Sequence, residues 1–143
     1  MTRTWILVAE SSRAKIYSTE NRAAIPEEVE DIVHPEGRLH EGDLVTDKPG
    51  NDPGAVGQGP HVLDDKVSAT RQEHIEFAKE LAERLEAGRT HGEFDRLAIA
   101  APPAFLGLLR DKLGREVKEM VFREIDKNLV RQPPEELRDY IWS

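Results

Sequence analysis

The chain contains no cysteine among its 143 residues. Disulfide bonds, thiolate nucleophiles and cysteine-ligated metal centres are therefore excluded. Aromatic residues are scarce, at 6% of the sequence, and no apolar run is long enough to cross a membrane. The apolar run that follows Arg3 is also too short for a signal peptide. We therefore expect a cytoplasmic protein that does not insert into membranes.

Acidic residues are in excess. The 28 acidic and 20 basic side chains give a formal net charge of −8. This charge favours solubility and works against broad nucleic-acid binding, although it is compatible with a local basic patch. The hydrophobic share of 38% and the charged share of 34% are typical of a soluble globular protein. A chain of this length fits one hydrophobic core, so we expect a single domain over residues 1–143.

The beginning of the chain has the pattern of three consecutive strands. The continuous apolar run 5–9 is typical of a strand that is buried on both faces. The alternation in residues 14–19 predicts a second strand, antiparallel to the first because a short Ser-Ser-Arg turn joins them. A more exposed alternation predicts a third strand over residues 27–34. Residues 35–68 are rich in Gly, Pro, Asp and His, and they predict a long loop.

The second half of the chain alternates between helices and strands. Thr70 and Glu73 match a capping box, which predicts the start of an amphipathic helix that ends near Gly88. A buried run over residues 94–101 predicts a strand parallel to the first, because a helix precedes it. The remaining segments are a helix over residues 102–110, a strand over residues 117–125 with a helix across 115–120 as the alternative, and a terminal helix over residues 133–142. The predicted fold class is therefore α/β, with a mixed five-stranded sheet in which three antiparallel strands precede helix, strand, helix, strand and helix. This order resembles the ribonuclease H-like fold.

Much of the sequence resembles the bacterial host attachment protein family. The resemblance rests on ILVAESSRAKIY from Ile6, HPEGRLHEGDL from His34, DKPG from Asp47, FDRLAIAAPPAFLGLLR from Phe94 and EIDKNL from Glu124. That family is in turn similar to the middle domain of the class 1 translation release factors of archaea and eukaryotes. The release-factor domain carries a Gly-Gly-Gln loop between its third strand and its first long helix, where the glutamine backbone helps water to attack the peptidyl-tRNA ester.

The resemblance has consequences for function. It implies a non-enzymatic binding domain that associates with the ribosome or with tRNA and needs no cofactor. One alternative is hydrolysis of the peptidyl-tRNA ester, with Gln58 as the catalytic residue between Gly57 and Gly59. In this chain Val56 stands where a Gly-Gly-Gln motif has its first glycine. A second alternative is a module that binds other proteins.

Candidate binding residues fall into two groups. Ligands of open α/β sheets bind beyond the carboxyl ends of the strands. The first group is expected at that edge and consists of Glu10, Ser11, Ser12, Arg13, Pro102, Asp126, Lys127 and Asn128. The alternative is that Asp126 and Asn128 only cap or turn the chain. The second group belongs to the predicted loop and consists of Arg38, Asp43, Gly57, Gly59 and His61.

We predict no metal site. A two-metal nuclease needs acids on the first strand, the first long helix and the next strand. Glu10, Glu73 and Glu76 supply the first two, but the run that ends at Ala101 has no acid. The histidines have no helical metal-ligand spacing. Two basic edges are candidates for RNA contact or for plain solvated faces, one with Arg3, Arg13, Lys15 and Arg22, the other with Lys112, Arg115, Lys118, Arg123, Lys127 and Arg131.

Overall fold

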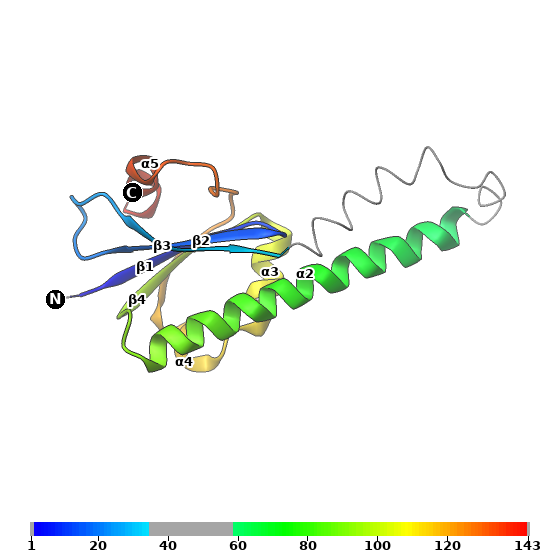
Figure 1. Ribbon diagram of the computed structural model, residues 1–143, viewed down its shortest axis with the longest axis horizontal. Coiled ribbons are helices and arrows are strands. Elements are labelled where there is room, and N and C mark those ends of the chain that lie inside the picture. The colour runs from blue at the N-terminus through cyan, green and yellow to red at the C-terminus, as the bar shows by residue number, and fades with distance from the viewer. Residues whose placement is uncertain (1, 35–58, 143) are drawn as a thin grey trace.

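One mixed β-sheet lies at the centre of the protein (Figure 1). The computed structural model describes residues 2–34 and 59–142, and for residues 59–68 it describes the backbone only. The five strands stand in the order β3-β2-β1-β4-β5. Their bounds are Thr4–Ala9 for β1, Arg13–Thr19 for β2, Glu27–Val33 for β3, Arg96–Ala100 for β4 and Val121–Ile125 for β5. The predicted α/β class with a mixed five-stranded sheet is confirmed.

The directions of the strands decide which side chains meet at each edge. Strand β2 pairs antiparallel with both β1 and β3, and β4 pairs parallel with both β1 and β5. The antiparallel first pair and the parallel return to the first strand were both predicted. As a result, the carboxyl ends of β1, β4 and β5 share one edge of the sheet with the start of β2 and the end of β3.

The helices cover the two faces of the sheet unequally. Helices α2 (Gly59–Thr90), α3 (Pro103–Lys112) and α4 (Arg115–Met120) lie on one face, and α5 (Pro134–Ile141) lies on the other (Figure 1). The central strand β1 supplies both cores, because alternate side chains of a strand point to opposite faces. Trp5 and Leu7 pack toward α2, and Ile6 and Val8 pack toward α5. The continuous apolar run of β1 follows from this burial on both sides.

Helix α2 begins earlier than its capping box predicted. It starts at Gly59, so Thr70 lies inside the helix and residues 59–68 do not belong to a loop. Pro60 stands in the first helical turn, where a missing N–H breaks no helical hydrogen bond. No glycine or proline follows in residues 61–68, so nothing in that stretch stops the helix from forming. Gly59 and His61, predicted as loop residues, are therefore helical.

Gly88 is a packing residue and not the end of α2. The helix continues to Thr90, and the left-handed conformation that follows it belongs to Gly92, with a φ of 68°. A Cβ atom on Gly88 would lie 2.7 Å from the Trp5 ring. Glycine at this position therefore lets the helix backbone approach the sheet.

The last strand is shorter than predicted. Residues 115–120 form α4, which was the alternative interpretation of this segment. Gly114 precedes the first turn of α4, and Val117 is fully buried in the core beneath α2 and α3. Only Val121–Ile125 remain extended as β5.

Candidate functional site

The carboxyl-end edge of the sheet brings together part of the predicted first group. The Asn128 side-chain amide donates a hydrogen bond of 2.8 Å to Glu10, so the segment after β5 meets the segment after β1. Asn128 Oδ1 also accepts a hydrogen bond of 3.1 Å from the Val130 backbone N–H. Asn128 therefore holds a turn and joins two strands. Asp126 and Lys127 are exposed beside it.

Carboxylates pair with two residues of the first predicted basic edge, Arg13 and Lys15. Arg13 forms an ion pair of 2.8 Å with Asp31, and its hydrogen bond holds the pKa of that carboxyl below its usual value. Lys15 lies 3.7 Å from Glu28. Ser12 is buried, and its backbone carbonyl accepts a hydrogen bond from the residue that follows β3. Arg13 and Lys15 therefore join neighbouring strands and contribute little free positive charge.

The predicted loop group is only partly covered by the structure. Arg38, Asp43, Gly57 and Gln58 lie outside the described residues. Gly59 and His61 belong to the backbone of α2. The binding role of this group and the catalytic role of Gln58 therefore stay predictions.

Arginine and aromatic side chains gather on the face of the sheet that α5 covers. Trp142 follows α5 and stacks on Phe122 of β5, with ring centroids 5.4 Å apart. The Arg96 guanidinium lies 4.8 Å from the Trp142 ring centre and 4.9 Å from that of Phe122. Arg22 approaches the Trp142 ring to 5.2 Å. Together with Arg138 of α5, these residues form what we call the arginine–aromatic surface.

Hydrogen bonds to the protein hold two of these arginines in place. Arg96 Nε donates to Thr4 Oγ1 over 2.9 Å, which leaves its two terminal nitrogens for other partners. Arg138 donates to the Ala23 carbonyl over 2.6 Å and so ties α5 to the turn between β2 and β3. A shallow hollow of about 470 Å³ lies beside Arg138 and is lined by Arg22, Ala23, Arg138, Asp139 and Trp142.

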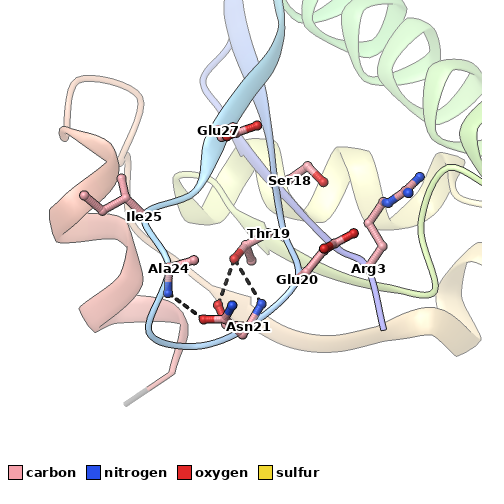
Figure 2. Close-up of a pocket in the computed structure, with 8 residues that line it drawn as sticks. All are labelled: Arg3, Ser18, Thr19, Glu20, Asn21, Ala24, Ile25 and Glu27. Atoms are coloured by element: carbon pink, nitrogen blue, oxygen red, sulfur yellow. Dashed lines mark hydrogen bonds between the residues drawn. The ribbon is translucent and has the colours of Figure 1, made fainter. Parts of the chain in front are cut away.

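The turn between β2 and β3 carries Arg22 to this surface. Figure 2 shows the turn folded on itself, with Thr19 and Asn21 at its centre and α5 beside it. Thr19 Oγ1 donates to the Asn21 carbonyl over 2.8 Å, and the Ala24 backbone N–H donates to the Asn21 side chain over 2.7 Å. A second hollow of about 410 Å³ opens beside this turn. The polar groups at the centre of this hollow, those of Thr19 and Asn21, already bond within the turn, so they stabilise the turn.

The arginine–aromatic surface differs in charge from the rest of the molecule. Among the described residues, no carboxylate lies within ion-pair distance of Arg22, Arg96 or Arg138. The arginines elsewhere are mostly paired: Arg13 with Asp31, Arg84 with Glu30 and Glu93, Arg89 with Glu86, Arg110 with Glu124, and Arg115 with Glu119. Unpaired guanidinium groups beside stacked rings suit a ligand that carries both phosphates and planar bases.

Sequence reasoning did not find this surface. It placed Arg22 with the strand residues Arg13 and Lys15, which the structure pairs with acids. Arg22, Arg96, Phe122 and Trp142 come from four separate segments, and no spacing in the sequence connects them.

Three further observations complete the description. Among the described residues, no helix has both the length and the apolar character to span a bilayer. No curated protein matches the sequence. A family model described as "Protein required for attachment to host cells" matches residues 5–141. Since this match covers almost the entire sequence, the chain belongs to that family of proteins required for attachment to host cells.

Proposed function

We propose that this protein is a non-enzymatic RNA-binding domain that associates with tRNA or the ribosome through the arginine–aromatic surface. The family description names a phenotype and leaves the chemistry of the partner open. The strand order, with two parallel strands added beside three antiparallel ones, supports the ribonuclease H-like and release-factor-like assignment. In this proposal residues 1–143 act as one domain.

One observation carries the proposal. Arg22 and Arg96 lie over the Trp142 ring, and Arg96 also lies over Phe122. Arg138 lines the same hollow as Trp142, and none of the three arginines has an acidic partner among the described residues. In a chain of net charge −8, such a group is a local exception to the overall repulsion of polyanions. RNA offers phosphates to the guanidinium groups and unstacked bases to the rings.

The chemistry of these side chains favours binding over catalysis. Arginine stays protonated at neutral pH and tryptophan only donates a hydrogen bond, so neither acts as a general base. Ester hydrolysis through Gln58 and the binding of other proteins are kept as alternatives. Release of peptide from peptidyl-tRNA by the wild type but not by Gln58→Ala would favour the first of these.

The test of the proposal is co-sedimentation with ribosomes at low and moderate salt. The wild-type protein should pellet at low salt and be released as salt rises, because phosphate contacts displace counterions. Trp142→Ala should pellet poorly, while circular dichroism confirms that it is folded. If the wild type stays in the supernatant even at low salt, the ribosomal form of the proposal is wrong. Binding to free tRNA then decides whether RNA is a partner at all.

A further inference from the structure

A histidine and three glutamates meet where β3 ends against α2. His34 directly follows β3 and is buried, with 8% of its surface exposed. Its backbone N–H donates to the Ser12 carbonyl over 2.9 Å, and its ring stacks on Phe77 at 5.2 Å. These contacts fix the imidazole, and both of its ring nitrogens face glutamates of α2.

The donor atoms stand close enough to share an ion. His34 Nε2 lies 3.0 Å from Glu73 Oε2. Glu76 is one helical turn further along α2, and one donor atom from each of the three residues lies within 4.8 Å of the others. Zinc binds nitrogen and oxygen at about 2.0–2.2 Å, so two ligands of one ion stand roughly 3–3.5 Å apart. The His34–Glu73 separation already fits, and the exposed Glu76 side chain needs only a small rotation.

The second ring nitrogen of His34, Nδ1, also faces a carboxylate, as in many histidines that bind a metal through the other nitrogen. His34 Nδ1 lies 3.6 Å from Glu80 Oε1. Histidines that bind a metal commonly donate their other N–H to a carboxylate, which fixes the tautomer and raises the basicity of the ligating nitrogen. When an ion takes the place of a proton on Nε2, Glu80 is the carboxylate close enough to stabilise the proton on Nδ1.

From this geometry we propose that His34, Glu73 and Glu76 bind one borderline divalent cation such as Zn²⁺. Among the described residues, three carboxylates lie close to this imidazole, and such a set of oxygen and nitrogen donors suits a dication. An imidazole ligand favours Zn²⁺ over Mg²⁺, which prefers oxygen and retains its water. The ion joins the end of β3 to α2. This site lies on the face of the sheet opposite α5, so the proposal is independent of the RNA-binding surface.

The experiment is a calorimetric titration of the tag-free, metal-stripped full chain with Zn²⁺. A parallel titration with Co²⁺ is followed by visible absorption, which reports ligation directly. We expect one equivalent to bind, and Glu76→Gln to weaken the affinity about tenfold or more. Glu135→Gln, an equally exposed glutamate on α5, is the matched control and should bind as the wild type does.

Two histidine variants test whether His34, and not another histidine, binds the ion. His91→Ala should leave Zn²⁺ binding unchanged, because the His91 ring bonds the Ala87 carbonyl at the end of α2. His34→Ala should abolish the Co²⁺ spectrum. If His34→Ala does not fold, Glu76→Gln still decides, since that side chain is exposed. Absence of binding at micromolar Zn²⁺, or equal affinity in Glu76→Gln and the wild type, would overturn the proposal.

Discussion

Replacing Gly88 by alanine is a sharp test of how α2 packs on the sheet. The added Cβ would lie 2.7 and 2.8 Å from two carbons of the Trp5 ring and 3.1 Å from the Phe94 ring. Both rings are buried, and they stack on each other at 4.8 Å. The Arg84 guanidinium covers the Trp5 ring from 5.0 Å, so the indole has little room to retreat.

The expected effect is the sum of two opposing contributions. Overpacking a well-filled core costs about 1–3 kcal/mol, because carbon atoms prefer separations of roughly 3.5–4.0 Å. Alanine in a helix interior is favoured over glycine by about 1 kcal/mol. We therefore expect Gly88→Ala to lower the free energy of unfolding by about 1 kcal/mol. Apart from the backbone of its own helix, no described atom lies within 4 Å of where a Cβ atom on Gly107 of α3 would stand, so Gly107→Ala should gain up to about 1 kcal/mol.

Urea unfolding followed by circular dichroism measures both variants. The two substitutions make the same chemical change in a helix, so their difference of about 2 kcal/mol isolates the contact with Trp5. If the two variants had the same free energy of unfolding, the inferred close contact between α2 and the Trp5 ring of β1 would be wrong.

Three further predictions concern charge and metal binding. Burial first, and then Glu28 and Asp31, raise the pKa of Tyr17. The unfolded chain therefore ionises first as pH rises, so stability should fall above about pH 10, and less steeply in Tyr17→Phe. Arg13 lowers the pKa of Asp31, so Asp31→Asn should be less stable than the wild type at neutral pH. That difference should shrink as the pH falls through the depressed pKa, and urea unfolding across a pH series measures both effects. Zn²⁺ should raise the melting temperature of the wild type more than that of Glu76→Gln, as differential scanning calorimetry would show.

Much of the sheet was predictable because its signals are local. The uninterrupted run in β1 requires burial on both faces, and the short Ser-Ser-Arg turn permits only an antiparallel partner. The prolines ahead of α3 and α5 also lie where sequence rules place them. These features depend on neighbours in the chain, so the sequence contains them in full.

The errors arose where tertiary contacts decide. Thr70 and Glu73 match a capping box, but the pattern carries no information on whether the helix has already begun. Gly88 resembles a helix end, yet the reason for glycine at this position is the Trp5 ring, which leaves no space for a side chain. The helix over residues 115–120 competes with a strand of similar pattern, and burial of Val117 under α2 and α3 favours the helix.

Both candidate sites join distant parts of the chain. His34 and Glu73 are 39 residues apart, and the Arg96–Trp142 contact links the start of β4 to the C-terminal end of α5. The predicted meeting of Glu10 and Asn128 could be found because strand direction places both at one edge. Strand direction says nothing about which helix residues face a histidine or which loop reaches a tryptophan.

The central claim is that the arginine–aromatic surface binds RNA. Its most direct test is the affinity of full-length protein for tRNA, by fluorescence anisotropy, in Arg22→Ala and in Arg115→Ala. Both arginines are exposed and each variant removes one positive charge, but Arg115 lies on the opposite face and pairs with Glu119. We predict that Arg22→Ala weakens binding and reduces the slope of affinity against salt by about one, whereas Arg115→Ala changes neither. Equal effects of the two substitutions, or a wild type that binds neither tRNA nor ribosomes, would contradict the account.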